Sequence, residues 1–329
     1  MTASCKKFKL RYYDKVISRK VNWLWYPYIP YGKITIVQGD PGEGKTTFVL
    51  NLVSKLTLGQ SLYNDKDKKV PQVVIYQSAE DGVEDTIKSR LEATGADCTK
   101  VVYLEYDGNS IALNDERIEQ AIIKSGAKLL VFDPLPAFIG DADMNRAGDI
   151  RVLMQKLAAV ADRTGCAIIL VGHMNKAATG KSIYRGLGSI DIAAVARSVL
   201  LIGRIKDNQR IRAVVHIKSN LAPEGKSIAF ELSEEAGFGW IDDFEITQEE
   251  LLSDAVSLND NKTSDAIRVI SELLTEKPML AVDIFEACEK SGISVRTAKT
   301  AKNIIGVKSI KSKDKWYWEL PISVIETNG

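Results

Sequence analysis

Short apolar runs alternate with amphipathic helical patterns from residue 33 to about residue 217. This alternation is typical of a parallel sheet flanked by helices, so the chain is predicted to have an α/β fold. From residue 198 the runs follow one another without helices, which predicts an antiparallel extension on one edge of the sheet. The predicted strands are 33–38, 73–77, 101–104, 128–133, 167–171, 198–203, 211–217 and 227–232, and the predicted helices are 45–57, 83–95, 115–125 and 147–164.

The pattern changes after an acidic and polar stretch at 247–262. Beyond it, apolar positions at helical spacing predict three short helices, followed by a strand pair at 307–310 and 316–320. Three helices and a hairpin are the elements of a winged helix-turn-helix. The predicted division is an N-terminal segment (1–20), a large α/β domain (21–246), a linker (247–262), a winged-helix domain (263–322) and a tail (323–329).

Composition excludes several classes of protein. The 329-residue chain has a formal net charge of +1, so any contact with nucleic acid must come from a local basic patch. Its four cysteines are far apart and form no C-x-x-C pair, which argues against a disulfide framework or a zinc site. No apolar run approaches the ~18 residues that span a bilayer, and the first residues lack the apolar core of a secretion signal. We therefore expect a cytoplasmic protein without membrane contact.

The strongest chemical motif lies between residues 39 and 47. A buried strand is followed by G-x-x-x-x-G-K-[ST] and then by a helix, which is the context that a phosphate-binding loop requires. The glycines let backbone N–H groups point at a phosphate, and the helix adds the positive end of its dipole. The motif predicts binding of ATP with Mg²⁺, in which Lys45 reaches the β- and γ-phosphates and Thr46 ligates the metal. The predicted ATP-binding residues are Gly39, Asp40, Pro41, Gly42, Glu43, Gly44, Lys45, Thr46 and Thr47.

A second acidic residue completes the predicted metal site. Asp133 ends the strand 128–133, where an acid commonly helps to hold Mg²⁺. Its alternative role is that of an ordinary strand-end acid before a turn. Many ATPases place the water-activating glutamate directly after this aspartate, but here that position is Pro134, which cannot accept a proton. The general base must therefore come from elsewhere.

Glu80 is the candidate base. It follows the strand 73–77, and a side chain there can overhang the γ-phosphate from a neighbouring strand. The alternative is a simple charge favoured by the dipole of helix 83–95, and Asp81 could act as the base if Glu80 does not.

His173 is the remaining candidate at this edge of the sheet. It follows the strand 167–171 and is one of only two histidines in the chain. A polar tip at the carboxyl end of that strand suits a γ-phosphate sensor, so we include His173 among the catalytic candidates. A lone histidine is more often structural, which is the alternative.

These motifs resemble RecA-fold ATPases of the RepA and DnaB type, especially the RepA-like ATPases of plasmids and phages. The resemblance covers roughly residues 21–245. It rests on Trp23-Leu24-Trp25 with Ile29-Pro30-Tyr31-Gly32-Lys33, Gly39 to Thr47, Ser78-Ala79-Glu80-Asp81, Leu130 to Pro134, Gly172-His173-Met174-Asn175-Lys176, Gly188-Ser189 with Ala194 to Ser198, and Lys218-Ser219-Asn220-Leu221-Ala222-Pro223.

The resemblance implies a RecA-like core and a homo-oligomeric ring, typically a hexamer, with ATP held between subunits. A basic finger from the neighbouring subunit completes such a site, and Arg197 and Lys218 match positions of this kind. An arginine in a surface salt bridge is the alternative reading of Arg197. DnaB helicases carry a large N-terminal domain that contacts primase, whereas only about twenty residues precede Val21 here, so a role with primase is not expected.

Two parts of the chain are predicted to contact single-stranded or double-stranded DNA. By analogy with the family, the loops 139–149 and 176–189 face the centre of the ring, where Lys176, Lys181 and Arg185 can follow a phosphate backbone. The winged helix concentrates basic residues on its third helix and its wing, which suits phosphates and groove edges. Solvated loops and a protein-contact domain are the alternatives. These candidates are Arg296, Lys299, Lys302, Lys308, Lys311, Lys313 and Lys315.

The sequence thus favours an ATP-hydrolysing, DNA-dependent motor, by resemblance a helicase of a plasmid, phage or other mobile element. An ATP-switched DNA-binding assembly factor or regulator, without unwinding activity, is the second hypothesis. A small-molecule kinase shares the phosphate-binding loop, but it should carry an arginine-rich substrate lid and no winged helix.

Overall fold

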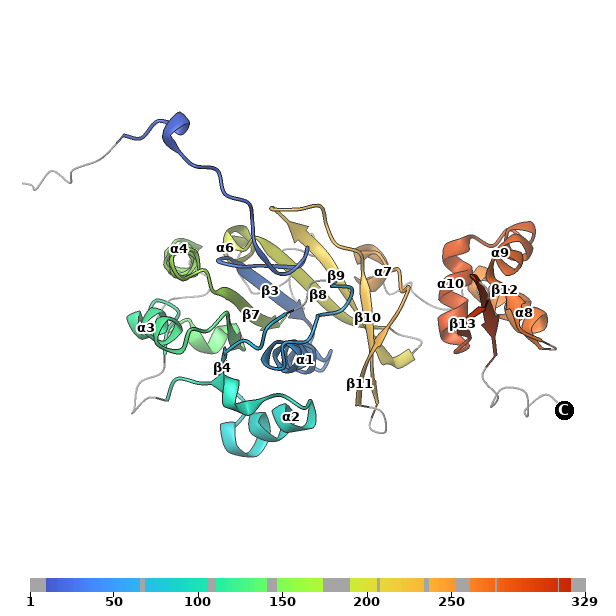
Figure 1. The fold of residues 1–329 in the computed structure, drawn as a ribbon, viewed down its shortest axis with the longest axis horizontal. Helices are drawn as coiled ribbons and strands as arrows, with labels where there is room; N and C mark the ends of the chain where they lie inside the picture. The colour runs from blue at the N-terminus through green and yellow to red at the C-terminus, as the bar shows by residue number, and fades with distance from the viewer. Residues whose placement is uncertain are drawn as a thin grey trace, which may run out of the picture.

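The computed structural model describes residues 10–65, 69–105, 111–140, 147–173, 190–205, 208–233, 237–252, 261–275, 277–312 and 314–320. Within these residues the large domain is built on a nine-stranded sheet of order β11-β10-β9-β8-β3-β7-β6-β4-β5 (Figure 1). The strands are β3 (Ile34–Gly39), β4 (Val74–Ser78), β5 (Val101–Val102), β6 (Leu129–Asp133), β7 (Ala167–His173), β8 (Ser198–Ile205), β9 (Asn208–Ser219), β10 (Ile228–Ser233) and β11 (Gly237–Ile241).

The mixed sheet confirms the predicted α/β fold. The strands from β5 to β8 in the sheet order are parallel, and β9, β10 and β11 extend the sheet in antiparallel fashion. One detail of the prediction was wrong: β8 pairs parallel with β3, so the antiparallel part begins at β9. The chain can turn from β8 directly into β9 because antiparallel neighbours need only a short connection.

Helices cover both faces of the sheet. One face packs against α1 (Lys45–Thr57) and α2 (Lys88–Ala93), together with the hairpin of β1 (Trp23–Trp25) and β2 (Ile29–Pro30). Residues from α3 (Glu116–Ser125), α4 (Ala147–Thr164), α6 (Ile190–Val195) and α7 (Gln248–Leu252) pack in the core on the other face. In β3, the side chain of Val37 packs on the face covered by α1 and α2, and that of Ile36 packs on the opposite face. This alternation with both faces apolar explains why the parallel strands appear in the sequence as continuous hydrophobic runs.

The edge strand β5 is shorter than the predicted 101–104. Past Val102, the backbone of Leu104 is held by a side chain instead of a neighbouring strand. Its N–H donates to Gln77 Oε1 at 3.0 Å, and its carbonyl accepts from Gln77 Nε2 at 3.2 Å. The amide of Gln77 therefore satisfies the backbone groups that strand pairing would otherwise satisfy.

His216 of β9 is linked to the start of β8 and to the loop before β10. Its Nδ1 accepts from the Gly225 N–H at 2.9 Å, so the ring proton lies on Nε2, which faces Ser198 Oγ at 3.0 Å. The ring is 3% exposed, and nearby Tyr28 donates its hydroxyl to the Lys226 carbonyl at 2.7 Å. This buried network needs a neutral imidazole.

Acidification should therefore destabilise the fold through His216. Burial lowers the pKa of His216 from 6.5 to about 4. Between these values the unfolded chain binds a proton that the folded chain does not, so this stability is complete above pH 6.5 and is lost as the pH falls toward 4. The loss approaches roughly 3 kcal/mol. Urea unfolding of the wild type and of His216→Asn, from neutral pH to about pH 4, should show a weaker pH dependence in the variant. Parallel curves would contradict this assignment.

The C-terminal part forms a separate small core. Its elements are α8 (Asn261–Leu274), β12 (Met279–Leu280), α9 (Ala281–Lys290), α10 (Val295–Ile304), β13 (Lys308–Ser312) and β14 (Lys315–Glu319), with sheet order β12-β14-β13. Ile270, Ile284, Ala298 and Trp318 are buried in this core. The three helices and the hairpin follow in the predicted order, and β12 adds a strand that the sequence analysis missed. The hairpin loop is shorter than the predicted 311–315, because Ser312 pairs with Lys315.

Candidate nucleotide-binding and hydrolytic site

The loop between β3 and α1 has the conformation of a phosphate cradle. Gly42 and Gly44 have φ angles of 79° and 84°, in the left-handed region that side chains rarely adopt. Gly39 lies against the backbone of Ile202 on β8, where a Cβ atom would collide with the carbonyl oxygen. Gly44 also caps the first turn of α1, since its carbonyl accepts the N–H of Phe48 at 2.9 Å. The three glycines of the motif are thus each required by backbone geometry.

Lys45 begins α1 and is only 4% exposed. Its ammonium donates to the carbonyl oxygens of Gly39 at 2.9 Å and of Asp40 at 2.7 Å. Burial lowers the pKa of Lys45, and nearby carboxylates, that of Asp133 first, oppose this effect. The side chain is therefore held inside the loop, where phosphate oxygens can replace the two carbonyl contacts.

Thr46 and Asp133 meet at the place predicted for Mg²⁺. Thr46 Oγ1 donates to Asp133 Oδ2 at 2.8 Å, and Asp133 is 8% exposed. A hydroxyl and a carboxylate are hard oxygen ligands, which suit Mg²⁺, and this ion commonly takes its other ligands from water and substrate phosphates. Accordingly, the described residues contain no cluster of three or more His, Cys, Asp or Glu side chains that could hold a metal alone. The residues present fit Mg²⁺ bound together with a nucleotide.

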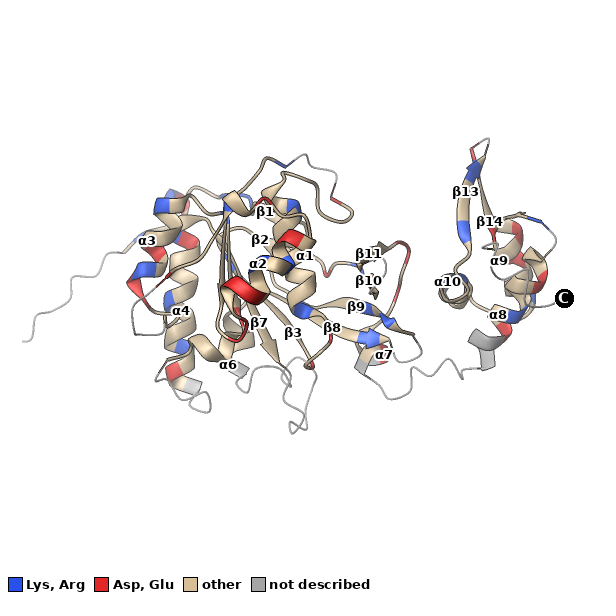
Figure 2. Ribbon diagram, turned by 90° about the horizontal axis from the view of Figure 1, so that it is seen from below, with Lys and Arg blue, Asp and Glu red and all other residues tan. Residues whose placement is uncertain are grey.

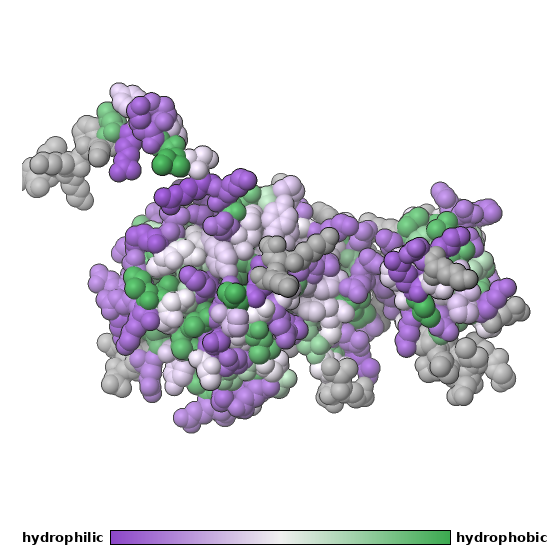
Figure 3. Space-filling model, viewed as in Figure 1, coloured by the Kyte–Doolittle hydropathy of each residue, from purple (hydrophilic) through white to green (hydrophobic). Residues whose placement is uncertain are grey.

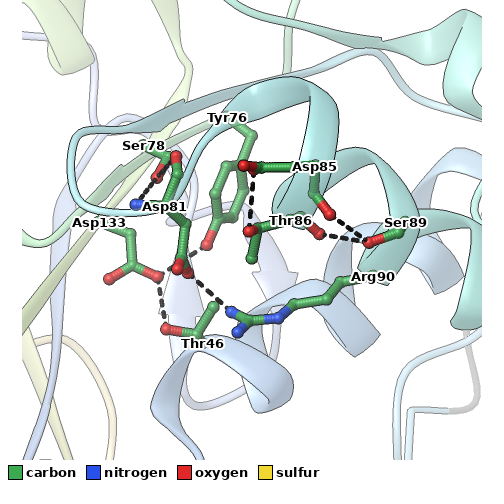
Figure 4. A network of polar contacts seen from close by, with 9 residues as sticks. All are labelled: Thr46, Tyr76, Ser78, Asp81, Asp85, Thr86, Ser89, Arg90 and Asp133. Carbon is green, nitrogen blue, oxygen red and sulfur yellow. Dashed lines mark hydrogen bonds and ion pairs between the residues drawn. The ribbon is translucent and has the colours of Figure 1, made fainter.

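The loop after β4 carries Glu80 and Asp81. Figure 4 shows Asp81 beside Asp133 and Thr46. The N–H of Ala79 donates to the Asp133 carbonyl at 3.1 Å, and the Ser78 hydroxyl donates to the Asp81 carbonyl at 2.9 Å. The loop is therefore anchored to β6 and closed by a tight turn. Its two acids differ in their contacts, and this difference separates their possible roles.

The Asp81 carboxylate forms an ion pair, whereas the Glu80 carboxylate has no partner among the described residues. Arg90 of α2 donates to Asp81 Oδ2 at 2.7 Å, as Figure 4 shows. The Glu80 side chain is exposed and makes no hydrogen bond or ion pair with the described residues, yet its charge is close enough to contribute to the electrostatics of Lys45. A free carboxylate near the phosphate-binding lysine suits a general base better than one already paired with an arginine.

The order of strands shows how Glu80 reaches this site. β4 neighbours β6, the strand that ends at Asp133, and both β6 and β7 lie between β4 and β3. Thr46 spans this gap from α1, which crosses over the sheet toward Asp133. Glu80 is thus a neighbour of the Asp133 strand, and the site is assembled across four parallel strands.

His173 ends β7, directly opposite Gly39 in the register of β3. Its Nδ1 is buried and has no hydrogen-bond partner within the described part of the chain. A buried imidazole nitrogen at the carboxyl end of the sheet, beside the phosphate-binding loop, has the position that a γ-phosphate sensor needs.

Arg197 and Lys218 lie at the opposite end of the sheet. Arg197 precedes β8, whose first residue pairs with Thr35 near the start of β3. Lys218 of β9 pairs with Val199, the second residue of β8. The phosphate-binding loop follows the other end of β3. Arg197 is exposed, but the Lys218 ammonium donates to three carbonyls at the end of α6, those of Ala193, Ala194 and Ala196. Neither residue can reach the nucleotide site of its own chain.

Two contributors were missed by sequence reasoning. Tyr76 of β4 donates its hydroxyl to Asp133 Oδ2 at 2.7 Å. Arg204 at the end of β8 donates to the Gly42 carbonyl at 2.9 Å, and this hydrogen bond links the phosphate-binding loop to β8. Strand alternation places Tyr76 on the face covered by α1, together with Val74. This alternation is the sequence pattern from which the position of Tyr76 could have been predicted. Arg204 could not be found in this way, because its contact depends on β8 pairing with β3.

The basic residues proposed for DNA contact are only partly described. Lys176, Lys181, Arg185, Lys313 and the side chain of Arg296 lie outside the described residues. Exposed lysines lie on β13 and at the start of β14. Figure 2 shows the basic positions along β13 in blue. Lys302 instead lies over the buried Trp318 ring, 5.2 Å from its centroid, and burial lowers the pKa of this lysine. Lys302 therefore has a packing role within the C-terminal core.

The parallel strands, the glycine loop and the Thr46–Asp133 pair together define a P-loop nucleotide-binding protein with a RecA-like core. The chain belongs to the AAA domain family, whose sequence profile matches residues 9–179, slightly more than half of its length. Within the described residues, no helix combines the length and the apolar character needed to cross a membrane.

Several characterised proteins are similar to this chain. The DNA repair protein RadA of Halalkalibacterium halodurans is 30% identical over 149 residues, which cover 44% of this chain and 28% of RadA. Protein RecA of Bordetella avium is 22% identical over 304 residues, 83% of this chain and 80% of RecA. Among solved structures, a KaiC-like protein of Pyrococcus horikoshii is similar with 19% identity and a TM-score of 0.49, covering 67% of this chain and 96% of that protein.

Proposed function

We propose that this protein is an ATP-hydrolysing, DNA-binding motor of the RecA fold, and specifically a RepA-like DNA helicase of a plasmid, phage or other mobile element. The observation that carries the hydrolytic part is the position of Thr46, Asp133 and Glu80 beside the phosphate-binding loop, where Glu80 has no partner among the described residues. A site built only to hold a nucleotide has no need for a free carboxylate at this place.

Each side chain has a distinct task in the proposed reaction. Lys45 neutralises charge on the β- and γ-phosphates, and Glu80 accepts a proton from the attacking water. His173 contacts the γ-phosphate and reports its loss. Mg²⁺, held through Thr46 and Asp133, would offset the charge of the phosphate oxygens. Pro134 excludes the alternative in which the base follows the strand-end aspartate.

The proposed homo-oligomeric ring is supported by the separation of Arg197 from its own site. A cation at the far end of the sheet can act on phosphate only in a neighbouring copy. The segment 10–20 is a second support. It extends away from the large domain, as Figure 3 shows, and its exposed apolar side chains are typical of a surface that binds another protein. They are Leu10, Tyr12, Tyr13, Val16 and Ile17.

The DNA-binding part rests on different observations. The name of one relative, the DNA repair protein RadA, associates a similar chain with DNA, and the C-terminal core presents exposed lysines on its hairpin. A winged-helix assignment of this core fits its helices and its three-stranded sheet, and basic wings commonly contact the DNA backbone.

Adding single-stranded DNA should raise the rate of ATP hydrolysis, and the protein should separate the strands of a tailed duplex. Phosphate release and strand displacement, each measured over a range of salt concentrations, test the two parts. Absence of hydrolysis would exclude the motor, as would a rate that DNA does not change at any salt concentration. DNA binding with slow hydrolysis and no strand separation would instead support the ATP-switched regulator.

A further inference from the structure

We infer that Tyr76 is a positioning residue for metal-dependent nucleotide binding, because its hydroxyl fixes the carboxylate of Asp133 so that one oxygen remains available to the Mg²⁺ shell. This inference rests on the proposed nucleotide site. It assigns a function to a strand residue outside the phosphate-binding loop and the catalytic acids.

Two donors hold the carboxylate of Asp133. One carboxylate oxygen, Oδ2, accepts two hydrogen bonds, from Tyr76 at 2.7 Å and from Thr46 at 2.8 Å. Figure 4 shows both donors on the same side of the carboxylate, with the other oxygen directed away from them. If Thr46 turns toward a metal ion, Tyr76 is the donor that still holds Oδ2 in place.

The register of β4 and β6 brings Tyr76 to Asp133. Tyr76 pairs with Val131 and Ser78 with Asp133, so the tyrosine lies two residues before the position opposite the aspartate. Its side chain is long enough to bring the hydroxyl to the carboxylate along the face that α1 covers. A phenylalanine would fill the same apolar space but could not donate.

The phenol of Tyr76 is enclosed within the domain. Its side chain is 3% exposed, and its hydroxyl donates to Asp133 Oδ2. Tyr76 also lines a cavity of about 140 Å³ together with residues of α2, so packing does not enclose its side chain completely. The hydrogen bond is needed to define the position of the hydroxyl.

Tyr76→Phe should weaken nucleotide binding in the presence of Mg²⁺ by about tenfold, because losing a hydrogen bond to a metal-linked carboxylate commonly has at least this effect. Binding in EDTA should not change, since the phosphate-binding loop itself is intact. A fluorescent ATP analogue, titrated in Mg²⁺ and in EDTA, measures both affinities without reference to hydrolysis.

Tyr28→Phe is the matched control. It also removes a phenol that donates over 2.7 Å in a buried network, but its partner is the Lys226 carbonyl, outside the nucleotide site. We expect a small loss of thermal stability in both variants and a changed Mg²⁺ dependence only in Tyr76→Phe. The inference is overturned if Tyr76→Phe keeps the Mg²⁺ dependence of the wild type, or if both variants lose affinity equally in Mg²⁺ and EDTA. A wild-type protein that binds no nucleotide would instead refute the nucleotide site itself.

Discussion

Replacing Glu80 with glutamine should slow ATP hydrolysis by about 10²- to 10⁴-fold while leaving ATP affinity near that of the wild type. Glutamine keeps the size and polarity of the side chain but cannot accept a proton from water. Nucleotide binding depends on the phosphate-binding loop and on the Thr46–Asp133 pair, neither of which contacts Glu80 among the described hydrogen bonds. Phosphate release at saturating ATP and titration with a fluorescent analogue separate the two effects.

Asp81→Asn is the matched control for this experiment. It makes the same chemical change one residue further along and weakens the partly exposed ion pair with Arg90. Exposed ion pairs of this kind contribute little to stability, so the folded protein should be retained. We expect Asp81→Asn to keep most of the hydrolytic rate, whereas Lys45→Ala should lose nucleotide binding. A slow Asp81→Asn variant beside a fully active Glu80→Gln variant would move the role of base to Asp81.

The different contacts of Glu80 and Asp81 show which features of the site could be predicted from the sequence. Motif spacing was enough to predict the phosphate-binding loop, and strand-end position was enough to select Asp133 and Glu80. The pairing of Asp81 with Arg90 could not be predicted, because it depends on how the π-helical turn Val83–Ile87 leads into α2 and directs Arg90 back toward the loop. Local patterns therefore named both acids as candidates, and only the tertiary contacts show that Asp81 is paired with Arg90.

Strand order was the main property that the sequence could not supply. Apolar runs predict strands but do not determine which strands become neighbours, since sheet order depends on how the crossover helices pack. Tyr76 and Asp133 are 57 residues apart, and their contact exists only because β4 lies beside β6. The short strands β1, β2 and β12 were also missed, because two or three residues carry too little periodicity to be recognised.

The same strand order leads to the prediction about subunit cooperation. Arg197→Ala should lower ATP hydrolysis by about 10³-fold if this arginine completes the site of a neighbouring copy. Its side chain is exposed and lies at the end of the sheet away from the phosphate-binding loop, so the substitution should leave folding and nucleotide affinity unchanged. Lys218→Ala should behave differently, because its ammonium holds three carbonyls at the end of α6. We expect that variant to lose thermal stability.

Mixing two inactive variants tests the trans role directly. Lys45→Ala chains cannot use their own site but still present Arg197, and Arg197→Ala chains keep an intact phosphate-binding loop. In a head-to-tail ring formed from equal amounts of both, roughly a quarter of the interfaces combine an intact loop with an intact arginine. Hydrolysis should therefore reappear after mixing under conditions that allow subunit exchange. Failure to recover, with exchange verified by labelled subunits, would place the defect of Arg197→Ala within its own chain. A fully active Arg197→Ala protein would exclude the arginine as the finger.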